Sequence, residues 1–319
     1  MTSTDKSLLV EGGASHTWVL VADTERIWAQ EWLPALNRIG ASEQAQRAVL
    51  ADVSRVTEGI DGIADAYFAV GAAATASYLS DFTALVSATL PERLRPPGRT
   101  CITNDVVPLL FAEDEESDQL VVIAGTGSGV AARRGFQAVS RAGSHEYLLG
   151  DDGGAFDIGR RALRAVIEHA EGRGPATALS ELVFQRTAGA EIDWYVYGSA
   201  NQKQTVGDFA RDVFAADADG DQVAAAILDS AAAGITGICR AALRAVGSPG
   251  PVAATFTGSL LTEPTGRLRR RVQDLLGSSI SAFRPVTVDA ALMYRTADVL
   301  RSEQPVFDAI ARAIPAARL

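Results

Sequence analysis

Residues 120–129, LVVIAGTGSG, read as a buried strand that runs directly into a turn of glycine and hydroxyl residues. Residues 7–15, SLLVEGGAS, make the same transition near the start of the chain. In both places a second strand follows the turn. Small residues at such a turn let backbone N–H groups approach a phosphate closely, without help from a lysine. The two copies therefore predict a nucleotide clamp built from two similar halves.

Composition places the chain among soluble globular proteins. Its 319 residues are 47% hydrophobic and 21% charged, which suffices for two domains with a sizeable core. The net charge of −10 argues against nucleic acid or an anionic membrane as the main partner, because both require a concentrated basic face. The only lysines, Lys6 and Lys203, lie outside any G-x-x-x-x-G-K-[ST] loop, so a P-loop is excluded.

The two cysteines indicate a reducing compartment. Cys101 and Cys239 are too few and too far apart in sequence for a disulfide framework or a C-x-x-C metal site. The first residues lack the basic and apolar regions of a signal peptide, and no apolar run approaches the roughly 18 residues of a membrane span. We therefore expect a cytoplasmic protein with no membrane partner.

The first half reads as a hairpin followed by alternating helices and strands. Val49, Leu50 and Val53 recur at helical spacing and predict the buried face of a helix. A short apolar run at 66–70 ends in Gly71 and predicts a strand that a turn stops. The expected elements are a hairpin over 8–23, strands over 27–32, 66–70 and 101–103, and helices over 43–59, 77–90 and 106–112.

The second half opens in the same way after an acidic loop at 113–118. We expect strands over 120–123, 130–134, 136–140, 252–256 and 283–288, and helices over 155–172, 206–216, 221–245, 259–276, 290–301 and 304–314. A third small-residue turn lies at 257–259. A hairpin-led α/β unit that occurs twice is not the β-α-β pattern of a dinucleotide-binding domain. It indicates two similar lobes around one cleft.

These motifs, in this order, resemble the sugar kinases of the BadF/BadG/BcrA/BcrD group, especially the N-acetylglucosamine kinase type, within the actin-like ATPase superfamily. The resemblance covers nearly the whole chain. It implies an α/β protein with a duplicated actin-like (ribonuclease H-like) ATPase fold and two lobes around a central cleft. The lobes would comprise residues 1–115 and 116–319, and the last helix could pack back on the N-terminal lobe. ATP and Mg²⁺ are the cofactors that this family uses.

The resemblance also implies roles at the nucleotide. Glu11 resembles the acidic residue near magnesium, and the turn after it resembles the first phosphate motif. Asp105 stands where the family carries its catalytic base, although an aspartate after a strand could also cap a helix. Residues 124–129 resemble the second phosphate motif and 257–259 the adenosine motif. The residues expected to bind the nucleotide are Gly12, Gly13, Ser15, Thr126, Gly127, Gly258 and Ser259.

The implied sugar site is less regular. Residues 150–154, GDDGG, resemble a family motif in which the first aspartate accepts from a sugar hydroxyl, although Asp151 and Asp152 could instead cap the helix that follows. Residues 143–146, GSHE, stand where the family often has glycine-glycine-tryptophan-glycine. The residues expected to contact the substrate are Asn37, Asn104, Ser144, His145 and Asp151.

The leading hypothesis is an ATP-dependent kinase that phosphorylates N-acetylglucosamine or glucosamine, at the 6-hydroxyl. Two other functions remain open within the same family and fold. One is the ATPase activator of a radical dehydratase, which binds an iron–sulfur cluster through cysteines at a dimer interface. The other is a sugar sensor without catalysis. Dimers are common among such kinases, so a homodimer is compatible with the resemblance.

Overall fold

The computed structural model describes residues 5–13, 16–36, 42–73, 75–113 and 117–319. The chain divides into two compact units. The first unit contains residues 1–117, 133–140 and 287–319, and the second contains residues 118–132 and 141–286. The last two helices therefore belong to the same unit as the first strands.

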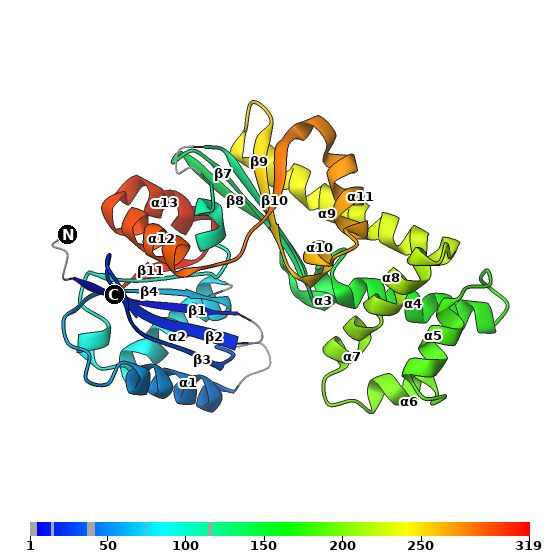
Figure 1. The fold of residues 1–319 in the computed structure, drawn as a ribbon, viewed down its shortest axis with the longest axis horizontal. Coiled ribbons are helices and arrows are strands. Elements are labelled where there is room, and N and C mark those ends of the chain that lie inside the picture. Colours follow the sequence, from blue (N-terminus) through cyan, green and yellow to red (C-terminus); the bar gives the residue numbers. More distant parts are fainter. Residues whose placement is uncertain (1–4, 14–15, 37–41, 74, 114–116) are drawn as a thin grey trace. The chain divides into compact units, whose positions relative to one another are not determined.

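The first unit is built on a six-stranded sheet in the order β11-β5-β4-β1-β2-β3 (Figure 1). The hairpin β1–β2 is present, as predicted, and the strand β3 that follows it pairs antiparallel with β2; β4 is parallel to β1, and β5 is parallel to β4. The short edge strand β11 was not predicted. The strands are β1 (Lys6–Gly12), β2 (His16–Ala22), β3 (Ile27–Pro34), β4 (Ile63–Val70), β5 (Thr100–Thr103) and β11 (Ala316–Arg318).

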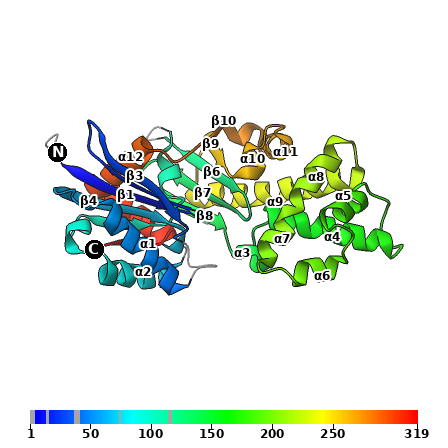
Figure 2. The ribbon, with the colours of Figure 1, turned by 60° about the horizontal axis from the view of Figure 1, so that its bottom comes forward.

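Four helices cover this sheet, and the views in Figures 1 and 2 show one pair on each face. One face carries α1 (Glu43–Val56) and α2 (Ala76–Thr89), and the other carries α12 (Ala290–Ser302) and α13 (Gln304–Ala313). Helix α1 begins at Glu43 because the Ser42 hydroxyl accepts from the Ala45 N–H at 3.2 Å. Its predicted apolar face is buried in the core at Val49, Leu50 and Val53.

The helix expected over 106–112 does not form. A single 3₁₀ turn, η3 (Pro108–Phe111), stands there instead. Its hydrogen bonds span three residues, as from the Val107 N–H to the Asn104 carbonyl at 3.1 Å. Pro108 is at the first position of this turn, where a proline is tolerated, so it marks the start of the turn and does not account for its shortness. Further 3₁₀ turns are η1 (Gly71–Ala73) and η2 (Glu92–Leu94).

The sheet of the second unit has the order β10-β9-β6-β7-β8. Its central strand β6 has β7 and β8 on one side and the parallel strands β9 and β10 on the other, which repeats the order β5-β4-β1-β2-β3 of the first sheet. The duplication predicted from the two turns is thus present. The strands are β6 (Gln119–Ala124), β7 (Ser128–Arg134), β8 (Ala138–Gly143), β9 (Val252–Thr257) and β10 (Ile280–Pro285).

The second unit also carries a helical part that the sequence patterns predict only incompletely. Two helices, α5 and α6, were not predicted, and the expected helix over 206–216 is split into α7 and α8. The helix expected over 259–276 breaks after Thr262, where Pro264 and the left-handed Gly266 (φ 63°) interrupt it. The helices are α3 (Glu146–Leu149), α4 (Ala155–Ala170), α5 (Leu179–Arg186), α6 (Ile192–Tyr197), α7 (Gln202–Asp208), α8 (Ala210–Ala218), α9 (Gln222–Val246), α10 (Ser259–Thr262) and α11 (Arg267–Leu276), followed by the turn η4 (Gly277–Ser279).

Helix α9 corrects the expectation that no apolar segment is long enough to span a membrane. Its length and mean hydropathy both meet that requirement, and it is the one helix among the described residues that does so. In the structure α9 packs against α8, α11 and β6. Leu228, Ile235 and Cys239 are fully buried along it. The apolar composition of α9 is therefore that of a core helix.

Candidate functional site

Glu11 lies at the end of β1, where its backbone pairs with Trp18 and Ala69 of the neighbouring strands. Burial, and secondarily the charge of Asp105, raise the pKa of Glu11 from 4.5 to about 7. Two carboxyl groups therefore share a poorly hydrated region at this end of the sheet. Such a pair favours either protonation of one member or the binding of a cation.

The turn after Glu11 is the predicted first phosphate loop. Gly12 is paired with Thr17 and Val70, so the loop is fixed to both neighbouring strands. The Gly13 N–H donates to the His16 carbonyl at 3.0 Å and closes the hairpin. Ser15, the predicted hydroxyl of this loop, lies outside the described residues.

Asp105 follows β5 on a turn that hydrogen bonds hold in place. The fully buried Tyr67 hydroxyl bonds Thr103 Oγ1 at 2.9 Å, and Thr103 Oγ1 donates to the Asn104 carbonyl at 3.2 Å. The Asn104 side-chain oxygen accepts from the Val106 N–H at 3.2 Å. Asn104, predicted to contact substrate, therefore uses its oxygen to shape the turn that carries Asp105. The 3₁₀ turn that follows has no side-chain cap at its first position, Val107.

The predicted second phosphate loop, residues 124–129, packs onto the start of α4. The Gly125 and Thr126 carbonyls accept from the Ala155 and Phe156 N–H groups at 2.8 and 3.2 Å. Gly125 also donates to the Gly127 carbonyl at 2.9 Å, which tightens the turn. Thr126 is exposed at the tip of this turn.

Asp151 lies directly against this second loop. Its side chain is so close that a Cβ at Gly127 would stand 2.3 Å from Asp151 Oδ2. The residue is buried, and its carboxylate accepts a hydrogen bond from the Ser128 backbone N–H. Burial raises the pKa of Asp151 despite that hydrogen bond. Helix α4 is capped by Gly154, without a side-chain hydrogen bond, so the capping role considered for Asp151 and Asp152 is not the one they have.

Backbone strain is concentrated in the segment before Asp151. Ser144, Glu146 and Asp151 have φ values of 58°, 65° and 59°, a region that residues with a Cβ seldom occupy. The Ser144 N–H donates to the Ser128 carbonyl at 3.0 Å, which ties this segment to the second phosphate loop. His145 is exposed beside it.

The third turn completes the group. Gly258 has a φ of 93° and packs against the Ala124 carbonyl and Gly125, and Ser259 opens α10 with its side chain exposed. All seven site residues predicted for the second unit lie on these turns and on the segment that ends at Asp151. They are Thr126, Gly127, Ser144, His145, Asp151, Gly258 and Ser259.

The other predicted site residues either lie in the first unit or fall outside the described residues. Glu11, Gly12, Gly13, Asn104 and Asp105 lie in the first unit, at the ends of β1 and β5. Asn37, like Ser15, lies outside the described residues, although the chain leading to it is anchored by a hydrogen bond from Thr17 Oγ1 to the Pro34 carbonyl at 2.8 Å.

One ion pair at this site was not predicted. Lys203 of α7 lies 2.6 Å from Glu146, measured from Nζ to Oε2, and both charges affect the pKa of Asp151. The sequence signal that could have indicated it is the rarity of lysine in this chain, where Lys203 is one of two.

The described residues contain no group of three or more histidine, cysteine, aspartate or glutamate side chains arranged for a metal ion. A magnesium ion held by ATP does not require one, because Mg²⁺ takes one or two protein carboxylates and fills its other positions with phosphate oxygens and water. Glu11 and its neighbour Asp105 fit that donor set.

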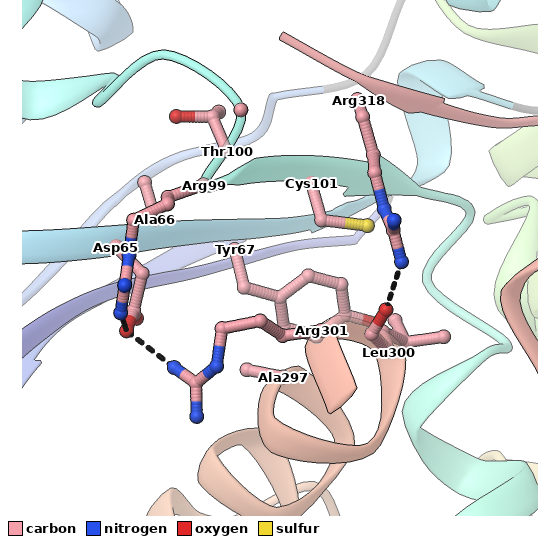
Figure 3. A pocket seen from close by; sticks show the side chains of 11 residues that line it. Asp65, Ala66, Tyr67, Arg99, Thr100, Cys101, Ala297, Leu300, Arg301 and Arg318 are labelled. Carbon is pink, nitrogen blue, oxygen red and sulfur yellow. Dashed lines mark hydrogen bonds and ion pairs between the residues drawn. The ribbon is translucent and has the colours of Figure 1, made fainter. Parts of the chain in front are cut away.

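A small cavity in the first unit lies near the start of β4 and β5 (Figure 3). It has a volume of about 40 Å³ and is lined by Asp65, Arg99, Arg301 and Arg318 among others. Arg301 bonds Asp65 at 2.6 Å and Arg318 bonds the Leu300 carbonyl. These arginines therefore fasten α12 and β11 to the sheet.

The arrangement of strands and turns defines the class of the protein, the duplicated actin-like ATPase fold. A candidate N-acetylglucosamine kinase from Chromobacterium violaceum has this fold with a TM-score of 0.69 and 18% identity, over 94% of this chain and 100% of that one. A second candidate N-acetylglucosamine kinase, from Porphyromonas gingivalis, has the same fold with a TM-score of 0.67 and 15% identity, over 93% of this chain and 99% of that one. A ROK hexokinase from Thermus thermophilus has the fold with a TM-score of 0.51 and 18% identity, over 92% of this chain and 96% of that one.

Within that class, the chain belongs to the BadF/BadG/BcrA/BcrD ATPase family, whose model matches residues 10–287. A stretch of 138 residues is 31% identical to the N-acetylmuramic acid/N-acetylglucosamine kinase of Clostridium acetobutylicum. The stretch comprises 42% of this chain and 45% of that enzyme, so the likeness spans less than half of the relative.

Proposed function

We propose that this protein is an ATP-dependent sugar kinase of the cytoplasm, which transfers the γ-phosphate to the 6-hydroxyl of N-acetylglucosamine or glucosamine. The observation that supports it best is the contact between the Gly127 loop and Asp151. A loop suited to phosphate and a buried carboxylate suited to a sugar hydroxyl are packed together in one unit. The kinase named for the Clostridium acetobutylicum relative points to the same substrate class.

In the proposed reaction Asp105 is the general base. The sugar hydroxyl oxygen attacks the γ-phosphorus, the bond from that phosphorus to the bridging β–γ oxygen breaks, and ADP leaves. The hydroxyl proton passes to the Asp105 carboxylate. The Tyr67–Thr103–Asn104 hydrogen bonds hold the turn that presents this carboxylate.

The other residues position the two substrates. The loops at Gly12–Gly13 and Thr126–Gly127 offer backbone N–H groups to phosphate oxygens, and Gly258–Ser259 forms the floor for adenosine. Asp151 accepts from a sugar hydroxyl, with Asn37, Asn104, Ser144 and His145 completing the sugar site. Mg²⁺, held near Glu11, would neutralise charge on the phosphates.

The chemistry of the cysteines and of the Glu11–Asp105 pair gives less support to the two alternative functions, a dehydratase activator and a sugar sensor. An activator with an iron–sulfur cluster needs thiolates, but burial raises the pKa of both Cys101 and Cys239 to about 12. Cys239 is fully buried in α9. A sugar sensor would not need the carboxyl pair of Glu11 and Asp105, which is costly to bury.

A coupled assay of ADP release across a panel of hexoses and amino sugars tests the proposal. We expect turnover with an amino sugar and a fall of about 10²- to 10⁴-fold in kcat for Asp105→Asn, with a melting temperature no lower than that of wild type, because the substitution removes one of two neighbouring carboxylate charges. Asp61→Asn, an exposed carboxylate before the start of β4, is the matched control and should keep full activity. NMR of the product identifies the phosphorylated hydroxyl. Absence of transfer to every sugar would refute the proposal.

A further inference from the structure

The loop that carries the proposed sugar ligands holds an ion pair between distant parts of the chain. Lys203 Nζ lies 2.6 Å from Glu146 Oε2, and 57 residues separate the two. The lysine side chain is 25% exposed and lies 5.5 Å above the Tyr147 ring. Lys203 is therefore committed to Glu146 by a charge-assisted hydrogen bond in a partly desolvated setting.

Asp151 lies beside this pair, and no lysine, arginine or histidine among the described residues forms an ion pair with its carboxylate. It is 6% exposed, and the hydrogen-bond donor that the structure gives its side chain is the neutral Ser128 N–H. Burial raises its pKa most, and among nearby charges the Glu146 carboxylate acts more strongly than Lys203 or His145. Asp151, Glu146 and Lys203 thus include two carboxylates and one ammonium, which leaves one negative charge uncompensated among these three groups.

The backbone keeps these charges in position. Glu146 is in the left-handed region at φ 65°, and Ser144 before it is held from two sides. The Ser144 N–H donates to the Ser128 carbonyl at 3.0 Å, and the Ser144 carbonyl accepts from Arg141 Nη2 at 3.1 Å. A carboxylate on a segment so constrained is preorganised for a ligand.

We propose that this loop selects a sugar bearing a positively charged amino group, with Glu146 as the specificity-determining residue and Lys203 as the cation that the substrate ammonium replaces. The inference rests on the proposed function and narrows its substrate to amino sugars with a free amine. An ammonium group compensates the Asp151–Glu146 charge, whereas a neutral acetamide leaves it uncompensated and a carboxylate adds to it.

A purely structural role for the pair makes a different prediction. If Glu146 and Lys203 only fasten α3 to α7, breaking the pair should alter the kinetics of every sugar alike. If they select for charge, it should alter the ratio of kcat/KM between glucosamine and N-acetylglucosamine. The ratio is therefore the informative measurement.

The experiment compares wild type with Glu146→Gln, Lys203→Met and the control Glu168→Gln, which alters an ion-paired carboxylate on α4. We expect wild type to prefer glucosamine. Glu146→Gln should lower the ratio of glucosamine to N-acetylglucosamine kcat/KM roughly tenfold, and Lys203→Met should raise it, because the lysine no longer competes. Glu168→Gln should leave the ratio unchanged.

A preference of wild type for N-acetylglucosamine, or a ratio unchanged in both variants, would overturn the inference. Should Glu146→Gln fail to fold, the kcat/KM ratio of Lys203→Met still tests the inference. If wild type phosphorylates no sugar, the proposed kinase function fails, and calorimetry of glucosamine and N-acetylglucosamine binding in the presence of a non-hydrolysable ATP analogue tests the charge selection separately. Equal affinity for the two sugars would then reject it.

Discussion

Gly127 and Asp151 are in direct contact, and the missing side chain of the glycine makes the space in which the aspartate carboxylate lies. A Cβ built on Gly127 would be 2.3 Å from Asp151 Oδ2 and 2.7 Å from its Cγ. Both residues belong to the second unit. The proposed second phosphate loop and Asp151, the residue proposed to bind the sugar, are therefore packed against each other, and a change in either should affect the other.

The first prediction concerns Gly127→Ala. The clash is with the end of a side chain, so we expect the Asp151 carboxylate to move at a modest cost in stability, about 1–3 kcal/mol. The displaced carboxylate should raise the KM for sugar at least tenfold. Steady-state kinetics and thermal melting check both. Gly237→Ala in α9, where an added Cβ meets nothing within 4 Å, is the matched control and should be neutral or slightly stabilising.

Gly258→Ala should act more strongly on the fold. Here the added Cβ would be 2.3 Å from the Ala124 carbonyl oxygen, a backbone atom that cannot rotate away, and the φ of 93° is unfavourable for alanine. We expect a melting temperature several degrees lower and weaker ATP binding, measured by calorimetry, because the turn borders the second phosphate loop. ATP affinity equal to that of wild type would show that this turn does not contribute to the nucleotide site.

Glu11 predicts a pH dependence of stability. Its pKa is raised from 4.5 to about 7, so the folded protein holds this proton more tightly than the unfolded chain does. Neutral Glu11 therefore favours folding below pH 4.5, and this contribution is lost as the pH rises through about 7. At about 1.4 kcal/mol per pH unit, the loss amounts to at most roughly 3.5 kcal/mol.

The test is urea unfolding of wild type and Glu11→Gln without nucleotide, at pH 5 and pH 8. The variant should be the more stable protein at pH 8, and the difference should shrink at pH 5. Glu25→Gln, an exposed residue of the loop after β2, serves as the control and should follow wild type at both values. A difference between wild type and Glu11→Gln that is independent of pH would contradict the assignment.

Local sequence patterns predicted the parts of the fold that depend on local chemistry. Adjacent small and hydroxyl residues predict the turns at 12–13 and 125–129. The helical spacing of Val49, Leu50 and Val53 predicts α1. Helix α6 could not be found in this way, because it is only six residues long, too short for a helical period to show, and none of its residues is buried. Strand β11 is three residues long and forms only by pairing with β5.

In the candidate site too, local motifs could be predicted from the sequence, whereas contacts between distant segments could not. Asp151 and Gly127 were recognised from their motifs, but their contact could not be, because it depends on how two loops 24 residues apart pack together. The Glu146–Lys203 pair depends in addition on the placement of α7. Tertiary pairing of charges leaves no periodic trace in the sequence, whereas turns and amphipathic helices do.

The last prediction concerns the ion pair that fastens α12 to the first sheet. Asp65 is 4% exposed, and its Oδ2 lies 2.6 Å from Arg301 Nη1 and 3.6 Å from Arg99 Nη2. Asp65→Asn leaves these guanidinium groups without their buried counter-charge, so we expect a loss of about 2–4 kcal/mol in urea unfolding. Catalysis should persist, because Asp65 lies near the start of β4, and Glu11 and Asp105 lie at the far ends of their strands. Glu43→Gln, in the exposed pair with Arg47, should change stability by less than about 1 kcal/mol. Equal effects of the two substitutions would mean that the Asp65 pair is no stronger than a surface contact.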